Sequence, residues 1–239
     1  MDVMDYKRVM VKVSGERLAG AEGREATGKI LEMVSLTEIA DELIALRAQD
    51  VQVAVVVGAG NILRGSEIAA TGIEAATAHQ MGMLGIVINA LALQSVIEGK
   101  GVPCRVLSAL SIDNVCEPYI KRRAERHLEK GRIVICAAGT GNPFFTSDTA
   151  GALRAIELGA DMLIKATKVD GIYDKDPAKH TDAVHQPTMT YKDVLVGDLK
   201  VMDGTAIALC REHGLPLMVC KAGELVAAVS GTAKATIVR

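Results

Sequence analysis

Short apolar runs alternate along the chain with longer stretches in which apolar residues recur at helical spacing. Residues 53–57 and 133–138 are continuously apolar, which is typical of strands buried on both faces of a sheet. Leu36, Ile39 and Leu43 fall on one face of a predicted helix. The strands predicted in this way are residues 9–13, 51–57, 104–107, 133–138, 162–166, 217–220 and 236–238. The predicted helices are residues 30–47, 77–98, 119–130, 149–158, 203–213 and 225–230.

This order of elements predicts an α/β fold. Strand, helix and strand repeated along a chain give a mainly parallel sheet with helices on its faces. Residues 169–190 differ because they are polar and interrupted by Gly171, Pro177 and Pro187, so a long excursion or a small hairpin is predicted there. No internal repeat or linker-like segment divides the chain, and residues 1–239 are predicted to form one domain.

The composition limits the kind of core and the kind of partner. Apolar residues make up 49% of the chain but aromatic residues only 3%, so the core is predicted to be aliphatic. The formal net charge is −2 and the isoelectric point is near 6.2, which argues against a nucleic-acid partner.

The cysteines and the apolar stretches indicate the cellular compartment of the protein and whether it contacts a membrane. Five cysteines without a Cys-x-x-Cys spacing indicate thiols in a reducing, cytoplasmic environment rather than disulfides. No signal-peptide pattern opens the chain. The longest apolar candidate, residues 81–93, is shorter than the roughly 20 residues of a membrane helix, so no membrane contact is predicted.

Parallel α/β sheets bind ligands at the carboxyl ends of their strands. That rule selects residues 12–15, 58–65, 139–148 and 167–176. In the first segment, Lys12 precedes Ser14 and Gly15, and an amine beside a flexible turn can neutralise phosphate oxygens. A solvated lysine at a strand end is the alternative.

The second segment is a glycine turn, residues 58–61, followed by Arg64. Such a turn lets phosphate approach backbone N–H groups, and an arginine binds phosphate oxygens in pairs. A dinucleotide-binding fingerprint would require glycine at position 63, which is Leu63, and no Walker A sequence occurs. A tight strand–helix turn without a ligand is the alternative.

The third segment, GTGNPFFTSD at residues 139–148, combines a turn with hydroxyl, amide and carboxylate groups at a predicted helix start. It contains both phenylalanines of the chain. This composition suits the binding of a phosphorylated small molecule. Asp148 is a catalytic candidate, and the alternative is that Ser147 or Asp148 caps the helix.

The fourth segment offers Tyr173 as a plane for a purine and Asp176 for a ribose hydroxyl or metal-bound phosphate, unless it is a charged surface loop. The basic residues 121–127 indicate a solvated face or a subunit contact rather than RNA binding. The five histidines have no metal-ligand spacing, and Mg²⁺ bound through phosphate oxygens needs none.

Together these segments resemble the bacterial uridylate (UMP) kinases of the amino-acid-kinase superfamily. The resemblance runs from Tyr6 to Val238, and its most specific parts are AGTGNPFFTSD, KATKVDGIYDKD, LKVMD and MGML. It implies a three-layer αβα sandwich, a homohexamer, and transfer of the γ-phosphate of ATP to UMP with Mg²⁺.

The resemblance also implies roles for individual residues. Lys12, Arg64 and Asp148 are the implied catalytic residues. Implied ATP contacts are Lys12, Val13, Ser14, Gly15, Gly60, Arg64, Thr167, Tyr173 and Asp176. Implied UMP contacts are Ala59, His79, Thr140, Gly141, Asn142, Pro143, Phe144, Phe145, Thr146 and Ser147.

Three positions depart from the family pattern. Ala59 replaces the middle of three glycines, and its methyl fits if the backbone torsion is not restricted to glycine. His79 replaces an aspartate that contacts the UMP ribose. The glycine-rich effector segment contains Arg24 and Glu25, which leaves activation by GTP open. Another small-molecule kinase of the superfamily and a non-catalytic nucleotide-binding or storage protein remain alternatives.

Overall fold

The computed structural model describes residues 6–20, 22–64, 67–68, 70–175, 177, 179–197, 199 and 201–239. Its main feature is a nine-stranded sheet in the order β4-β3-β5-β2-β1-β6-β10-β11-β9. Neighbouring strands are parallel except for β10 and β11, which are antiparallel. The strands of this sheet, in chain order, are β1 Arg8–Val13, β2 Gln52–Val57, β3 Cys104–Ser108, β4 Glu117–Pro118, β5 Ile133–Ala137, β6 Met162–Thr167, β9 Thr188–Met189, β10 Leu217–Lys221 and β11 Ala235–Val238.

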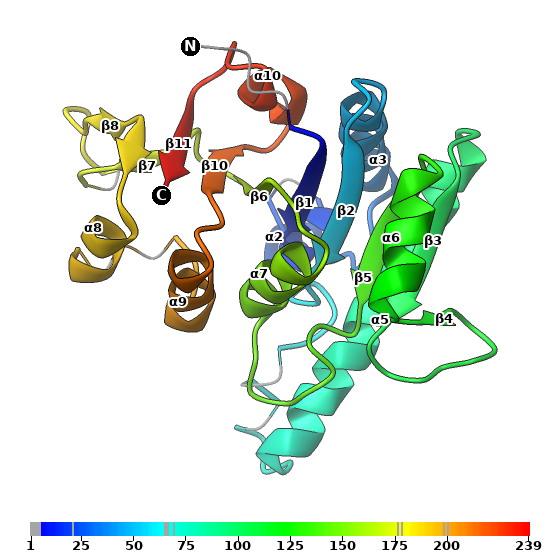
Figure 1. Ribbon diagram of the computed structural model, residues 1–239. Helices are drawn as coiled ribbons and strands as arrows, with labels where there is room; N and C mark the ends of the chain where they lie inside the picture. The colour runs from blue at the N-terminus through cyan, green and yellow to red at the C-terminus, as the bar shows by residue number, and fades with distance from the viewer. Residues whose placement is uncertain are drawn as a thin grey trace.

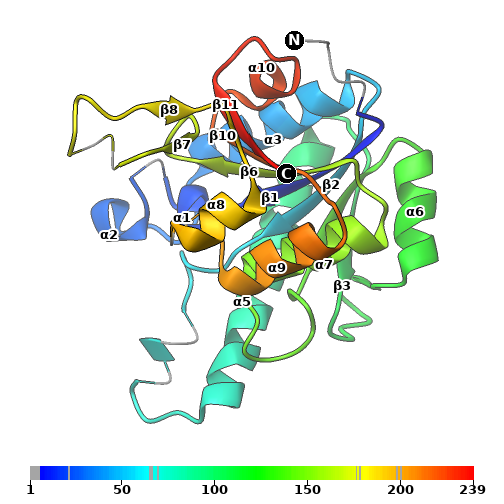
Figure 2. The same cartoon turned by 60° about the vertical axis from the view of Figure 1, so that its left-hand side comes forward.

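Helices cover both faces of the sheet (Figures 1 and 2). One face packs against α3 Met33–Arg47, α5 Ala75–Gly99 and α10 Leu225–Val229. The other packs against α6 Lys121–Glu129, α7 Ser147–Glu157, α8 Tyr191–Val196 and α9 Gly204–Glu212. The predicted three-layer αβα sandwich is therefore confirmed.

The strand side chains divide between the two layers as the pleat requires. Val9, Val11 and Val13 of β1 point into the α3 and α5 layer, whereas Met10 points into the α7 layer. Both cores are aliphatic, as the low aromatic content predicted. Lys12 follows the same alternation and lies on the α7 face, almost completely buried at 7% exposure.

Most predicted elements differ from the structure by only a few residues. The largest difference is at α3, which begins at Met33 instead of residue 30. Glu32 is the N-cap and has an extended backbone (φ −120°, ψ 124°), and its N–H donates to the carbonyl of Leu18 (2.7 Å), so the helix begins only at Met33. The predicted excursion at 169–190 contains a hairpin of β7 Ile172–Tyr173 and β8 His185–Gln186.

The sequence pattern missed several short elements. They are α1 Gly15–Leu18, α2 Arg24–Thr27, α8, β4 and β9. Each is six residues or fewer, which is too short to express a hydrophobic period.

Helix α5 is longer than predicted. By length and composition it would suffice to cross a membrane, and an 18-residue window of it has a mean hydropathy of 1.6. Its buried residues, among them Ile86, Ala90 and Leu93, pack on the sheet instead. A buried core helix meets the same criterion, so this length does not indicate a membrane span. The amino-terminal part of α5 extends beyond the sheet at the bottom of Figure 1.

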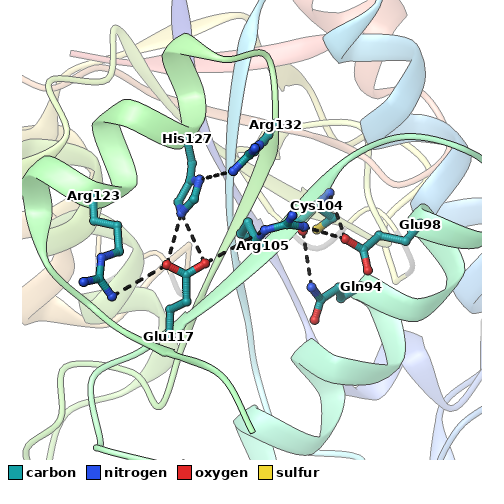
Figure 3. A network of polar contacts seen from close by, with 8 residues as sticks. All are labelled: Gln94, Glu98, Cys104, Arg105, Glu117, Arg123, His127 and Arg132. Atoms are coloured by element: carbon teal, nitrogen blue, oxygen red, sulfur yellow. Dashed lines mark hydrogen bonds and ion pairs between the residues drawn. The ribbon is translucent and has the colours of Figure 1, made fainter. Parts of the chain in front are cut away.

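A polar network anchors the edge strand β4 to α6 (Figure 3). Glu117 accepts from Nε2 of His127 (3.3 Å) and pairs with Arg123 (3.7 Å) and Arg105 (3.9 Å). Arg132 lies 2.9 Å from Nδ1 of His127 and can only donate, so Nδ1 is the acceptor and Nε2 carries the proton toward Glu117. Because β4 has only two residues and few backbone hydrogen bonds, these side-chain contacts help to hold it in place.

Candidate active site

Three turns meet at the carboxyl ends of β1, β2 and β5. A Cβ placed on Gly15 would lie 2.7 Å from Gly58 C and from Gly60 N, so the first turn touches the backbone of the second. A Cβ on Gly58 would lie 3.2 Å from the hydroxyl of Ser147, which starts α7 after the third turn. Only glycine allows backbones to approach this closely, so the structure explains why these turns contain glycine.

Two buried amides hold the glycine turn in place. Asn61 and Asn89 exchange side-chain hydrogen bonds of 2.9 and 2.7 Å, and both side chains are fully buried. Asn89 also donates to the carbonyl of Gly58 (2.7 Å), and Asn61 donates to that of Ile30 (2.7 Å). The paired amides therefore fix the turn to α5 and to the segment before α3.

A carboxylate between two lysines lies under these turns. Nζ of Lys12 is 2.7 Å from Oδ1 of Asp148, and Nζ of Lys165 is 2.9 Å from Oδ2. Lys165 also donates to the carbonyl of Val201. The Lys12 distance is that of a charge-assisted hydrogen bond, so Lys12 acts on Oδ1 through both its charge and a direct contact. An ammonium carries three N–H donors, so Lys12 can contact Asp148 and still donate to another anion.

The two lysines determine the ionisation of Asp148. Burial acts to raise the pKa of this carboxyl, but the charges of Lys12 and Lys165 outweigh it and hold the pKa below its ordinary value. For Lys165, burial together with the nearby Lys12 lowers the pKa despite the attraction of Asp148. Asp148 is therefore a charged group that positions cations, and it is poorly suited to accept a proton.

The start of α7 shows which residue caps the helix. Thr146 is the N-cap, and its hydroxyl accepts from the N–H groups of Asp148 (3.1 Å) and Thr149 (3.3 Å). The alternative that Ser147 or Asp148 caps a helix starting at 149 is wrong, because the helix starts two residues earlier and the Asp148 carboxylate points at the lysines.

Asp203 ties this helix start to α9. It accepts from the hydroxyls of Thr146 (2.5 Å) and Thr149 (2.8 Å), and it caps α9 through the N–H of Ala206 (3.0 Å). One carboxylate thus fixes two helix N-termini against each other.

The loop before α7 has an unusual backbone. Ala138 and Phe144 have positive φ angles of 59° and 71°, which non-glycine residues rarely adopt. Phe144 is 64% exposed, and its ring lies 5.0 Å from that of His79 on α5. An exposed aromatic side chain on a strained loop beside a polar ring is typical of a ligand-binding loop.

Ala59 fits without a glycine-only torsion, because it is not among the described residues with positive φ. A Cβ on Gly85 of α5 would lie 3.1 Å from the Ala59 methyl. The glycine on the helix therefore provides the room that the methyl on the turn requires.

A cleft of about 1130 Å³ opens beside the first turn and Arg64, while Gly60 and Asp148 lie outside its lining. Lys12, Ser14, Arg64, Lys165 and Thr167 all line it, so residues from distant parts of the chain share one space. The cleft continues past Lys221 to acidic side chains of α3.

Other predicted residues lie outside the cleft lining. The side chain of Val13 is in the core, so only its backbone can face a ligand. Tyr173 donates from its hydroxyl to Asp170 (2.6 Å) and packs edge-on against His185, with ring centroids 5.3 Å apart. Residues 140–147 lie on the loop beside His79 instead, and Asp176 lies outside the described residues.

Sequence reasoning assigned no role to Lys165, Asp203 or Glu16. The first two occur within the motifs KATKVDGIYDKD and LKVMD, so their positions were visible but their partners were not. Glu16 directly follows Gly15, yet its contact with Arg64 (2.9 Å) joins residues 48 positions apart. No periodic signal could reveal these pairs.

The fold and the lysine–carboxylate site define the class of protein. Residues 7–221 match the Amino acid kinase family, and the chain belongs to that family.

Its individual relatives narrow the class further. The chain is 50% identical over 236 residues to a protein named uridylate kinase from Dichelobacter nodosus, covering 98% of this chain and 96% of the relative. It is 52% identical over 219 residues to a uridylate kinase from Xanthomonas oryzae pv. oryzae, covering 92% and 89%. The crystal structure of a UMP kinase from Bacillus anthracis superposes with a TM-score of 0.91 at 34% identity, covering 99% and 97%.

Proposed function

We infer that the protein transfers the γ-phosphate of ATP to UMP, giving UDP and ADP. Relatives that are about half-identical over most of the chain are named uridylate kinases. The observation that supports it best within the molecule is the pairing of Lys12 with Asp148 (2.7 Å), together with Lys12, Lys165 and Arg64 all lining one cleft. A nucleotide-storage protein would not need a lysine–carboxylate–lysine group that is largely shielded from solvent.

Phosphoryl transfer requires positioning and charge compensation more than covalent chemistry. In our proposal Lys12 and the backbone N–H groups near Gly15 and Gly60 compensate the charge on the transferring group. Arg64 binds the acceptor phosphate. Asp148 orients Lys12 and Lys165, and its lowered pKa keeps it charged for this role. The acceptor phosphate is mostly ionised at neutral pH, since its second pKa is about 6, so no general base is needed.

The remaining residues divide between the two nucleotides. We assign to UMP Ala59, His79 and the loop Thr140, Gly141, Asn142, Pro143, Phe144, Phe145, Thr146 and Ser147. To ATP we assign Val13, Ser14, Thr167, Tyr173 and Asp176. The contact of His79 with Phe144 supports the first group, because it brings α5 to the loop. The place of Thr167 in the cleft beside Lys12 supports the second.

Magnesium enters the proposal through the nucleotide. Within the described ranges no group of three or more His, Cys, Asp or Glu side chains could hold a metal ion, and both oxygens of Asp148 face lysines. This arrangement fits Mg²⁺ held by ATP phosphate oxygens rather than by a protein cage. When bound, the ion neutralises part of the phosphate charge.

We further propose a cytoplasmic homohexamer that binds neither nucleic acid nor membranes. The five cysteines are free thiols, and four of them are buried, which suits a reducing compartment. The net charge of −2 supports the absence of a nucleic-acid partner. Exposed Leu84 and Ile88, one turn apart on α5, offer an apolar surface for subunit contact.

The deciding experiment is release of ADP from ATP, coupled to NADH oxidation, with and without UMP. We expect release to depend on UMP, with UDP formed in equal amount. Parallel assays with CMP, dUMP, carbamate and N-acetylglutamate test the other acceptors of the superfamily. Release with one of these but not with UMP would refute the assignment of the acceptor, and release with none would refute the kinase activity.

A further inference from the structure

Glu16 has no assigned role, yet its carboxylate contacts Arg64 and lies against the glycine turn, two parts of the proposed phosphate site. It is the second residue of α1, and its side chain is 28% exposed. It lines the same cleft as Lys12 and Arg64. The contacts of Glu16 with Arg64 and with the glycine turn suggest why its negative charge lies where a phosphate is expected to bind.

One oxygen of the Glu16 carboxylate contacts Arg64, the residue that we assign to the acceptor phosphate. Oε1 accepts from Nη2 of Arg64 at 2.9 Å. A Cβ on Gly60 would lie 3.0 Å from this oxygen and 3.4 Å from Nε of Arg64, so the carboxylate and the guanidinium both rest against the glycine turn. Within the described part of the chain, the backbone N–H groups of Gly60 and Asn61 donate to no backbone carbonyl. The turn thus keeps free donors beside an anion.

The second oxygen reaches the segment after α1. Oε2 accepts weakly from the N–H of Arg24 (3.4 Å), and a Cβ on Gly23 would lie 3.2 Å from it. Arg24 in turn donates from its guanidinium to the carbonyl of Ile62 (2.6 Å), next to the turn. Glu16 therefore joins the glycine turn, Arg64 and this segment through one negative charge.

We propose that Glu16 is an internal competitor for the phosphate of UMP. In the absence of nucleotide its carboxylate neutralises Arg64. When UMP binds, the phosphate dianion takes over Arg64, and the carboxylate must withdraw because two anions at one guanidinium repel each other. A nucleoside without phosphate cannot displace Glu16, so the residue adds selectivity for a phosphorylated acceptor. This inference rests on the proposed function, since Arg64 must be the acceptor-phosphate ligand.

The test compares Glu16→Gln with Glu67→Gln. Glu67 also pairs with Arg64 but at 3.6 Å, and it is 68% exposed, so its removal changes the charge near Arg64 without opening the turn. The probes are UMP and uridine, titrated by calorimetry into each full-length protein. Because the Glu16 pair is partly exposed, we expect Glu16→Gln to bind UMP about two- to five-fold more tightly. Uridine binding should stay the same, and Glu67→Gln should resemble the wild type with both probes.

Each result is decisive. Unchanged or weaker UMP binding by Glu16→Gln would overturn the proposal and make Glu16 a support for Arg64. Tighter binding of both UMP and uridine would also overturn it, because the effect would not depend on phosphate. If Glu16→Gln fails to fold by circular dichroism, Glu16→Asp replaces it, since the shorter side chain retracts the charge and should also tighten UMP. A wild type that neither binds UMP nor releases ADP with it would refute the proposed function rather than the role of Glu16.

Discussion

At the residue scale, the site depends on an uneven balance of charge. Two lysines flank one partly buried carboxylate, so the group as a whole is positive. Burial of an unpaired ammonium is costly, and Asp148 reduces that cost for both lysines. A net positive charge remains available to anionic nucleotide phosphates. In our proposal the same three side chains therefore stabilise the fold and attract the nucleotide phosphates.

Lys12→Ala tests the charge that stabilises the transferring group. We expect kcat to fall at least about 100-fold, the usual effect of removing one donor from a preorganised anion site. Lys165 still pairs with Asp148, so the protein should stay folded by circular dichroism. Lys7→Ala, an exposed change before β1, is the control and should keep wild-type activity. Near-normal turnover of Lys12→Ala would refute its role.

Asp148→Asn tests the lowered pKa through the pH dependence of stability. A carboxyl with a folded-state pKa below its unfolded value of about 4 stabilises the protein above that pH, and the stabilisation is lost as pH falls through the lowered pKa. We expect Asp148→Asn to lower the free energy of unfolding by about 3 kcal/mol at pH 7, since it leaves the buried Lys12 and the partly buried Lys165 without a counter-ion. The difference from wild type should shrink below about pH 4. Urea titrations at pH 3–7 measure it, and a difference that stays constant over this range would contradict the pKa shift.

His79→Asp tests the contact of α5 with the acceptor. Imidazole can hydrogen-bond a ribose hydroxyl, but a carboxylate offers a pair of acceptors. We expect the KM for UMP to fall several-fold in His79→Asp, with a smaller effect in the neutral His79→Asn. Steady-state kinetics with varied UMP would show it. An unchanged KM in both variants would mean that the packing of His79 on Phe144 is its main role.

At the scale of elements, the close approach of two strand–helix turns assembles the site. Gly15 begins α1 directly after β1, and its Cα faces the backbone between Gly58 and Gly60. The turns after β1 and β2 can only meet because these strands are parallel neighbours in register. Glycine at position 15 is thus required by its contact with the backbone of residues 58–60, which lie far away along the chain.

Gly15→Ala should separate these turns. Its Cβ would lie 2.7 Å from three backbone atoms, which cannot move as a flexible side chain would. We expect kcat/KM to fall by more than tenfold, together with a loss of about 1–3 kcal/mol in the free energy of unfolding. Gly204→Ala is a matched control, since Gly204 also opens a helix but an added methyl there would meet no atom within 4 Å. Steady-state kinetics and urea titration of both variants measure these effects. Equal kcat/KM and equal free energies of unfolding for the two variants would disprove the steric argument.

At the scale of the whole molecule, one sheet divides two aliphatic cores. The strands contribute alternate side chains to each, so neither core can form without the sheet. We propose on this basis that residues 1–239 fold as one domain. The exposed apolar residues of α5 lie outside both cores, on a face that the fold itself does not use.

The predicted homohexamer can be tested on that face. Light scattering after size exclusion should give six times the chain mass of 25.2 kDa for the wild type. Leu84→Glu and Ile88→Glu place charge where each side chain is about half exposed, and we expect both to reduce the mass. Val184→Glu is the control, because Val184 is 57% exposed on the distant hairpin region. Hexamers that survive both α5 changes would exclude this surface as the contact.

Much of the molecule was determined by the sequence itself. Continuous apolar runs such as residues 53–57 can only be satisfied between two layers, so the parallel sheet followed from the pattern. The glycine turn and residues 139–148 indicated phosphate chemistry, because few other residues let a backbone approach an anion. Their place at strand ends followed from the order of elements.

Only the tertiary structure decided which charges meet. Lys165 and Asp148 are 17 positions apart, and Glu16 and Arg64 are 48 apart, so no local spacing encodes either contact. The cap of α7 likewise depended on backbone torsions at Thr146 that composition does not fix. Secondary structure is specified by local periodicity, whereas pairing of charges is specified by the strand order, which brings β1, β6 and α7 together in space.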